Sequence, residues 1–505
     1  MARCRPYAAL PPPPPSPPSV NDYDPPTKRA CHTAASYIDA LPDDVLIGII
    51  SRLPIRDAVA TGGVAARWRH LWKHAPRLSL RPCHLRLKGY DHDGEEPAAG
   101  EADDERAARF AAVASSVLRQ HRGVGLDKLV FELPLAPGRH AAELEQAVAF
   151  AAAADAPELH FSLAASSRRQ RAAAPAYEFP HWRFAGGRLR RLVLGNVSLA
   201  AAAPPPPPPR GLEGLAQLKL LTLTGVAVDD AGVASVLSAC GALLGLELRE
   251  CPQLAHLTAA HAGLVLLDVD SCGGLKSITL RSSRLHVLSY RGHRVDVDYT
   301  HAPSIAKLTV LFPDGNGCPL DCIGGGGGAA AAFVPKLKHL FLQFPSPVNA
   351  ACSHKFAALS KIVLLLMKTP WREHVVSVAN LLRAAPSVKE LCIEVHGDLP
   401  MPPPDTPPMA IRWPKRCSPR KLRSVAIGGF GGEAELVELA LFLARRSPAL
   451  RTVAVDTHRR HLIGFSKRNW CREESEDPLR CYYARGIAWT HLAPKIPSTV
   501  KFTVL

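Results

Sequence analysis

Histidine and cysteine give this chain its main capacity for metal chemistry, because the sequence holds 21 histidines and 13 cysteines. A structural zinc ion needs four such ligands at characteristic spacings. The groups that come closest are the quartet His458, His461, Cys471 and Cys481, and the pair Cys318 and Cys322. The quartet has a spacing that fits no zinc module, and the pair supplies only two of the four ligands. We therefore expect ordinary surface histidines and buried thiols, with no metal site and no cofactor.

Local motifs of enzymes are absent from the sequence. The glycine run 324–328 continues into alanines, so it lacks the Lys and Ser/Thr of a G-x-x-x-x-G-K-[ST] phosphate loop. Neither H-E-x-x-H nor G-x-S-x-G occurs. A nucleophilic pair among the many His and Cys residues is possible, but no local signature selects one. We expect a protein that is not an enzyme.

Length and composition limit the remaining classes. The 505 residues are enough for two to four domains or one long repeat array. No run of 18 apolar residues occurs, and no apolar signal core precedes the proline run Pro11–Pro15, which argues against a membrane span and against secretion. Because the cysteines are odd in number and form no C-x-x-C pair, we expect reduced thiols in an intracellular protein of the nucleus and/or cytoplasm.

The positive charge of the chain is concentrated in one region. Residues 411–472 hold fourteen Lys/Arg and four acids, so they carry +10 of the net +16. Such a cluster can bind nucleic acid, but no nucleic-acid-binding motif accompanies it. A solvated face or an acidic protein partner is the simpler interpretation, and we regard nucleic acid as an unlikely partner.

A recurring pattern, aliphatic-x-x-aliphatic-x-aliphatic, predicts the elements that organise most of the chain. Copies that start at 243, 264, 285 and 305 lie 21, 21 and 20 residues apart, and further copies occur from Leu126 to Leu450. The final x-aliphatic-x-aliphatic has the two-residue period of a strand, and a unit this short must stack on its neighbours to bury its apolar side. Two units continue into Cys251 and Cys272 and resemble leucine-rich repeats. A generic parallel α/β domain is the alternative, and the near-equal spacing weighs against it.

Two apolar helical stretches near the start carry the functional signal. Residues 41–53 read LPDDVLIGIISRL, with acids at the expected helix start and aliphatic residues on one face. A second helical stretch places Val64, Trp68, Leu71 and Trp72 on one face. Some forty residues cannot enclose this much apolar surface, so either the repeats or another protein must cover it. Tryptophan is enriched at interface hot spots, which favours a partner.

The motifs LPDDVL, I-S-R-L-P and R-W-R-H-L-W resemble those of the F-box family in order and spacing. The resemblance implies a three-helix module that docks on the Skp-type adaptor of a cullin–RING ubiquitin ligase. The adaptor-contacting positions that it implies are Leu41, Pro42, Leu46, Ile49, Ile50 and Leu53 in the first helix. The later helix adds Val64, Trp68, Leu71 and Trp72, with the alternative that some of these four hold the module together instead. Ala66 stands where many relatives have Ser, and Gly62-Gly63 should loosen the middle helix by about 1 kcal/mol each.

Residues 421–456 resemble the FBD segment of plant F-box/leucine-rich-repeat proteins. The sequence has the expected strand, G-F-x-G turn, acidic amphipathic helix and closing strand, and Leu436, Leu439, Phe442 and Leu443 form the apolar helix face. We predict an α/β fold in which an F-box module precedes an irregular leucine-rich-repeat solenoid that ends in an FBD-like unit. The predicted domains are a disordered Pro-rich tail 1–36, an F-box 37–80, a linker with an acidic loop 81–125, a solenoid 126–410, an FBD-like repeat 411–457 and a basic segment 458–505.

The F-box resemblance implies the substrate-recognition subunit of a Skp–cullin–F-box ubiquitin ligase, with a protein target held by the repeats. The alternative is a leucine-rich-repeat interaction scaffold that recruits no ligase. The x positions of the strands are the candidates for target binding: Glu247, Arg249, Asp268, Asp270, Arg291 and Phe341, with Thr222, Thr224, Ser289 and Gln343 beside them. Solubility alone is the simpler explanation of each of these residues.

Overall fold

The structure is a computed structural model of the chain. It describes Ile38 and residues 40–85, 101–163, 177–184, 187–199, 215–313, 332–344, 355–367, 371–396, 411–415, 417–458, 460–462, 470–472 and 478–505. None of the described helices is both long and apolar enough to span a bilayer. Several expectations lie outside the described residues: the disordered tail 1–36 and the pair Cys318 and Cys322. The same holds for the Pro-rich runs 204–209 and 400–408 and the Gly run 324–328, which the composition predicts to be surface insertions or linkers.

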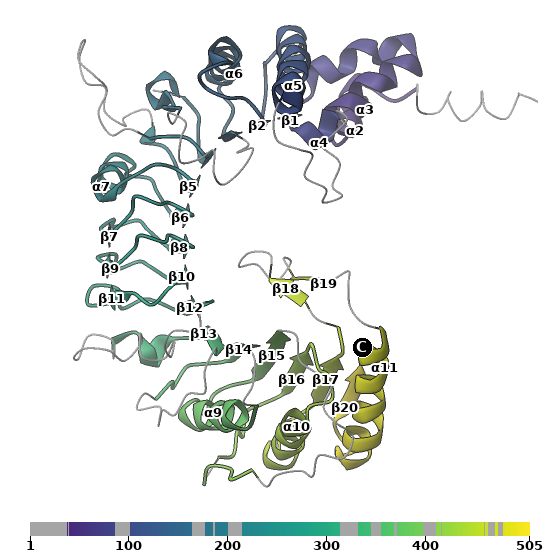
Figure 1. Ribbon diagram of the computed structural model, residues 1–505, viewed down its shortest axis with the longest axis vertical. Coiled ribbons are helices and arrows are strands. Elements are labelled where there is room, and N and C mark those ends of the chain that lie inside the picture. Colours follow the sequence, from purple (N-terminus) through teal and green to yellow (C-terminus); the bar gives the residue numbers. More distant parts are fainter. Residues whose placement is uncertain are drawn as a thin grey trace, which may run out of the picture.

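One curved sheet of fifteen strands runs through the molecule, and each strand pairs in parallel with its neighbours (Figure 1). In sheet order the strands are β1 Arg77–Leu80, β2 Lys128–Leu133, β3 Glu158–Leu163, β4 Arg191–Gly195, β5 Leu220–Thr224, β6 Gly245–Arg249, β8 Leu266–Asp270, β10 Val287–Arg291, β12 Lys307–Leu311, β13 His339–Phe344, β14 Lys361–Met367, β15 Glu390–His396, β16 Ser424–Gly428, β17 Thr452–Asp456 and β20 Lys501–Val504. The strands line the inside of the curve and the connecting segments form its outside (Figure 1). The predicted solenoid is confirmed.

Unit length decides what forms the outer layer. Where register partners are 25 to 30 residues apart there is room for a helix, as in α6 Ala141–Ala154, α7 Asp230–Ala239, α9 Trp371–Ala384 and α10 Ala434–Arg446. Between β6 and β12 partners lie only 20 or 21 residues apart. These short units place the strands β7 His256–Ala259, β9 Ser277–Leu280 and β11 Asp296–Asp298 on the outside, as a second sheet. A returning helix would need more chain than these units contain.

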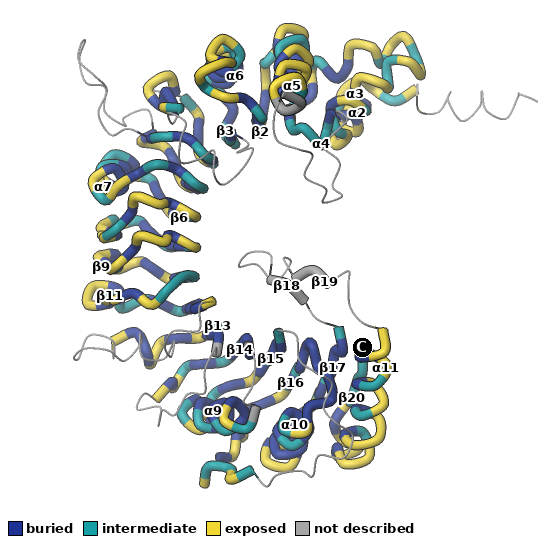
Figure 2. The backbone as a smooth tube through the Cα atoms, in the orientation of Figure 1, coloured by how far each residue is buried: buried dark blue, intermediate teal, exposed yellow. Residues whose placement is uncertain are grey.

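The aliphatic positions of the repeat pattern form one continuous core. Leu243, Leu246 and Leu248 are fully buried, and so are their counterparts in the other units (Figure 2). The thiols of Cys251 and Cys272 are buried as predicted, and each lies 3.8 Å from a strand carbonyl of the preceding unit, which it can reach as a donor. Burial of each unit against the next is what stabilises the array, because no unit has a core of its own.

The C-terminal boundary of the solenoid differs from the prediction. Residues 458–505 are not an appended basic segment, because α11 Pro478–Ile487 leads through the helical turns 488–495 into β20, which pairs with β17. The buried Arg480 of α11 donates to the carbonyl oxygens of Gly429 (2.7 Å) and Thr457 (3.3 Å). This arginine therefore ties the last helix to the G-F-x-G turn of the FBD-like unit. The apolar helix face predicted there, on α10, is buried.

The N-terminal boundary also moves. β1 lies inside the predicted F-box segment, yet it is the first strand of the repeat sheet and pairs with β2. The predicted linker 81–125 contains the short helix α4 Pro82–Leu85 and the long helix α5 Glu101–Gln120, whose start falls within the stretch expected to be an acidic loop. Asp104 and Glu105 lie near the start of α5, where the helix dipole favours negative charge, so acidic residues here are compatible with a helix.

Candidate partner-binding surfaces

The N-terminal module is built from α2 Asp43–Ile50, α3 Ile55–Ala60 and the 3₁₀ segments η1 Thr61–Gly63 and η2 Ala66–His74. Pro42 precedes α2, Asp43 and Asp44 occupy its first turn, and Pro54 separates it from α3. Figure 1 places these elements at the N-terminal end of the curved sheet. The structure therefore contains the helices expected of the F-box motif, in the expected order.

The later helical stretch is interrupted, which corrects the prediction of one helix through Val64 and Trp72. Ala65 has an extended conformation with φ −148° and ψ 145°, and it divides η1 from η2. Glycine has a low helix propensity, and Gly62-Gly63 precede the break. A Cβ on Gly62 would lie 3.1 Å from the Cα of Arg69, so the two segments approach closely at this glycine.

Arg67, the first arginine of R-W-R, fastens η2 to the start of α2. Its guanidinium donates to the Asp43 carboxylate, with Nε 2.8 Å from Oδ1, and to the carbonyl oxygen of Leu41 at 2.9 Å. The ion pair is largely exposed, so its contribution is modest. Packing supplies the rest, because Leu46 and Ile50 of α2 and Leu71 and Trp72 of η2 belong to the buried core.

A buried joint connects this module to the repeats. The Trp72 and His121 rings lie 6.5 Å apart, and His121, which follows α5, packs edge-on against Phe150 of α6 at 6.0 Å. His121 Nε2 lies 3.2 Å from the carbonyl oxygen of Ala75, and Nδ1 accepts a hydrogen bond from the Gly123 N–H at 3.0 Å. Burial lowers the pKa of His121, against the opposing effect of the Ala75 carbonyl. A neutral imidazole satisfies both contacts.

The ten predicted adaptor contacts divide into three groups by their exposure in the structure. Leu46, Ile50, Leu71 and Trp72 are buried within the chain, because α2, η2 and the repeats pack on them, so they stabilise the module and are not accessible to a partner. Leu41 and Trp68 are half-buried. Pro42, Ile49, Leu53 and Val64 are exposed. The prediction is thus corrected for Leu46 and Ile50, whereas for Leu71 and Trp72 burial agrees with the alternative that they hold the module together. Trp72 packs against His121, which follows α5.

Exposed apolar side chains are concentrated on this module. Among the described residues fifteen large hydrophobic side chains are exposed, and six of them fall between Ile38 and Val64. They are Ile38, Val45, Ile49, Leu53, Val59 and Val64, with exposed fractions from 40% to 71%. We call these six residues the outer face. Sequence reasoning left Ile38, Val45 and Val59 out of the adaptor contacts, although Val45 lies four residues before Ile49 on the same helix.

The target-binding candidates lie in two columns on the inner surface of the sheet. Thr222, Glu247, Asp268 and Ser289 are register partners on successive strands, and Phe341 continues this column on β13. A second column holds Thr224, Arg249, Asp270 and Arg291. Alternate residues of a strand face opposite sides, and the intervening leucines are in the core. The predicted x positions are therefore brought together on one surface.

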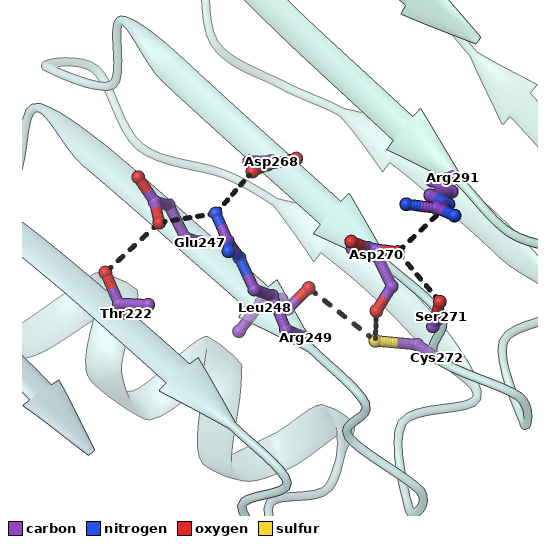
Figure 3. Close-up of polar contacts among 9 residues, drawn as sticks. All are labelled: Thr222, Glu247, Leu248, Arg249, Asp268, Asp270, Ser271, Cys272 and Arg291. Atoms are coloured by element: carbon purple, nitrogen blue, oxygen red, sulfur yellow. Dashed lines mark hydrogen bonds and ion pairs between the residues drawn. The ribbon is translucent and has the colours of Figure 1, made fainter. Parts of the chain in front are cut away.

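The charged members of the two columns are paired with one another, as Figure 3 shows. One guanidinium nitrogen of Arg249, Nη2, lies 3.2 Å from the Glu247 carboxylate and 3.3 Å from that of Asp268. Arg291 approaches Asp270 at 3.9 Å, and Thr222 donates to Glu247 at 3.3 Å. Burial raises the pKa of Asp268 to about 7, although Arg249 opposes the shift.

Access differs among these candidates. Glu247, Arg249, Asp270, Arg291 and Phe341 are half-buried and remain reachable from the inner surface. Thr222, Asp268, Ser289 and Gln343 are buried, because side chains of adjacent strands cover them. These four are corrected from direct contacts to supporting positions.

The described residues contain no group of three or more His, Cys, Asp or Glu arranged to hold a metal ion. His461 and Cys471 face each other across the β18–β19 hairpin (Arg460–Leu462 and Trp470–Arg472), but the structure does not describe their side chains. Cys481 is buried and His458 pairs with Asp456 at 3.1 Å. The absence of a metal site stays a prediction.

Comparisons with known proteins agree with this geometry. Residues 38–80 match the F-box domain family, and residues 117–505 match the family described as At1g61320/AtMIF1, LRR domain. The F-box/LRR-repeat protein At5g02910 of Arabidopsis thaliana is 23% identical over 366 residues, 71% of each chain. The F-box/FBD/LRR-repeat protein At1g80470 of Arabidopsis thaliana is 40% identical over 57 residues, which are 11% of this chain and 12% of that protein. The match to the LRR domain family begins at residue 117, within α5, and extends to residue 505. It therefore includes β20, consistent with β20 as a repeat strand. The chain belongs to the plant F-box/LRR-repeat proteins, with an F-box followed by a leucine-rich-repeat domain.

Proposed function

We propose that this protein is the substrate-recognition subunit of a Skp–cullin–F-box ubiquitin ligase, acting in the nucleus and/or cytoplasm. Its outer face binds the Skp-type adaptor, and the inner surface of the repeats holds a protein target near the ubiquitin-charged enzyme. The protein contributes proximity and no catalytic group, so its effect is an increased effective concentration.

The observation that carries this proposal is the outer face. Six large hydrophobic side chains remain exposed between Ile38 and Val64, whereas the other nine exposed ones are spread over the described residues from Val113 to Leu505. Burial of one such side chain yields about 1.5–3 kcal/mol, so a partner that covers several of them gains enough for stable association. Family membership supports the identity of that partner, because the module matches the F-box domain.

The experiment is a titration of purified Skp-type adaptor with wild-type protein and two matched variants. Val45→Asp changes the outer face, and Val113→Asp makes the same change on α5, at a valine of similar exposure (43% and 38%). We expect Val45→Asp to abolish binding and Val113→Asp to leave it unchanged. Equal affinity of all three proteins for the adaptor would contradict the proposal.

The inner surface supports a protein target over a small molecule. Its reachable side chains, Glu247, Arg249, Asp270, Arg291 and Phe341, are spread over strands β6 to β13. A surface this extended suits a polypeptide. Proximity labelling with wild-type protein and Val45→Asp identifies targets, because a true target binds both proteins and is ubiquitinated only with the wild type.

A scaffold that recruits no ligase is the second candidate, and the packing of Trp72 against His121 favours it in part. This contact covers one side of the module with the chain's own repeats, as a scaffold requires. The outer face remains uncovered by any described residue, and for that reason we rank the scaffold second. Failure of the wild-type chain to bind any Skp-type adaptor would favour it.

A further inference from the structure

One continuous row of backbone hydrogen bonds crosses the strand entrances of the repeat sheet. The N–H of each row residue donates to the carbonyl oxygen of its counterpart in the preceding unit, at 2.8 or 2.9 Å from Lys219 onward. In order the row comprises Arg190, Lys219, Leu244, Val265, His286, Ala306, Lys338, Ser360, Lys389, Arg423 and Arg451. The side chains at this row and at the next position are therefore spaced like the strands, about 4.8 Å apart.

The chemistry of this edge changes abruptly at β12. The two entrance positions of β6, β8 and β10 contain no Lys or Arg: Leu244 and Gly245, Val265 and Leu266, His286 and Val287. Each of the next seven strands carries one basic residue there, namely Lys307, Lys338, Lys361, Lys389, Arg423, Arg451 and Lys501. We call these seven residues the basic edge.

Among the described residues, few carboxylates pair with the basic edge. Glu390 pairs with Lys361 at 2.5 Å, whereas Lys389, Arg423 and Arg451 are exposed and form no ion pair with a described residue. Like charges on directly opposed strand positions destabilise a sheet, and Lys389, Arg423 and Arg451 are direct neighbours in this way. An anionic partner would relieve that repulsion.

We infer that the basic edge binds an acidic segment of a protein partner in extended conformation. Seven strands at this spacing cover about 29 Å, which an extended peptide of about nine residues spans. The entrance positions of these strands include no Phe, Tyr or Trp, so they lack the stacking groups with which proteins bind single-stranded nucleic acid. The site is separate from the outer face and from the inner columns, and it does not depend on the proposed function.

A charge-reversal pair tests the inference in the full chain. Lys389→Glu/Arg423→Glu/Arg451→Glu changes the basic edge, and Lys276→Glu/Arg281→Glu/Arg284→Glu makes the same net change at exposed residues beside β9 on the outer sheet. The probe is fluorescent poly-L-glutamate of about twelve residues at about 0.15 M salt. We expect the edge variant to bind it at least tenfold more weakly than wild type, and the control variant to bind within about twofold of wild type.

Three results would overturn the inference: wild type that does not bind the probe, equal weakening in both variants, or a single-stranded RNA of matched charge that binds the edge more tightly than polyglutamate. If the edge variant melts at a lower temperature than wild type, Lys389→Gln/Arg423→Gln/Arg451→Gln provides the test instead, because it removes charge without adding repulsion. Adaptor affinity, measured in parallel, should be equal in all variants, so that failure here is distinguishable from failure of the proposed function.

Discussion

The N-terminal module and the units of the repeat array are both too small to bury their apolar side chains alone, and they differ in what covers those side chains. The array stacks its units, buries its aliphatic residues and pairs the charges of its inner surface, as with Arg249 between Glu247 and Asp268. The module buries one side through Leu46 and Trp72 and leaves the outer face uncovered. The array is therefore complete without a target, whereas the module presents apolar surface that a partner must cover. Adaptor binding should be constitutive, and target binding should depend on displacing internal charge pairs.

The largest effect should separate the two sides of helix α2. Leu46→Ala removes a fully buried side chain and should lower the free energy of unfolding by about 2–5 kcal/mol. Ile49→Ala, one turn away and 46% exposed, should change it by less than about 0.5 kcal/mol. Urea denaturation of both variants measures the difference, and equal destabilisation would mean that α2 has no outer side.

The joint between the two regions should respond to acid. Burial lowers the pKa of His121 in the folded chain, so the unfolded chain binds more protons as the pH falls below about 6.5. The contribution of His121 to the free energy of unfolding is therefore present above about pH 6.5 and is lost at lower pH. Protonation also removes the acceptor for the Gly123 N–H. We expect the unfolding free energy of wild type to fall more steeply from pH 7 to pH 5 than that of His121→Phe. If the free energy of unfolding of both proteins fell equally with pH, the acid response would not come from His121.

The inner surface should respond to pH with the opposite sign. The folded-state pKa of Asp268 is raised from 3.8 to about 7, so the folded chain binds more protons in that window and stability falls as the pH rises from about 4 to about 7. Asp268→Asn should therefore be more stable than wild type at pH 8 and should flatten this dependence. Asp270→Asn, in the neighbouring column, is the matched control. If both variants flattened the pH dependence of the free energy of unfolding, that dependence would not be specific to Asp268.

The smallest effect should come from the surface ion pair of the module. Arg67 and Asp43 are 42% and 58% exposed, and exposed pairs of this kind contribute about 0.2–1 kcal/mol. A double-mutant cycle with Arg67→Ala and Asp43→Ala measures the coupling. A coupling near zero would show that α2 and η2 are held by packing alone.

Sequence patterns predicted which segments form strands and helices better than they predicted the contacts between those elements. Repeat spacing identified the solenoid, and alternation placed Glu247 and Asp268 on the face opposite the leucines, because strand geometry is local. The alternation could not show that Arg249 lies between the carboxylates of Glu247 and Asp268, because that contact depends on the register of neighbouring strands. Helical periodicity placed Leu46 and Ile49 in one apolar helix. Which of them faces outward is decided by the contact of α2 with η2, whose buried Leu71 and Trp72 lie more than twenty residues further along the chain. β20 was missed because its residues lie 49 positions after their partners on β17, as with Lys501 and Thr452, and the intervening chain includes the helix α11. This separation is far longer than the repeat spacing.

The most direct test of the account compares the adaptor affinity of Ile49→Ala with that of Trp72→Phe by calorimetric titration. Both residues belong to the F-box motif, but Ile49 is exposed and Trp72 is 3% exposed against His121. We predict that Ile49→Ala weakens binding by about 5- to 30-fold, in line with the loss of apolar burial, and that Trp72→Phe stays within about twofold of wild type. The reverse order would contradict the division of the module into an outer face for the partner and an inner side for the chain itself.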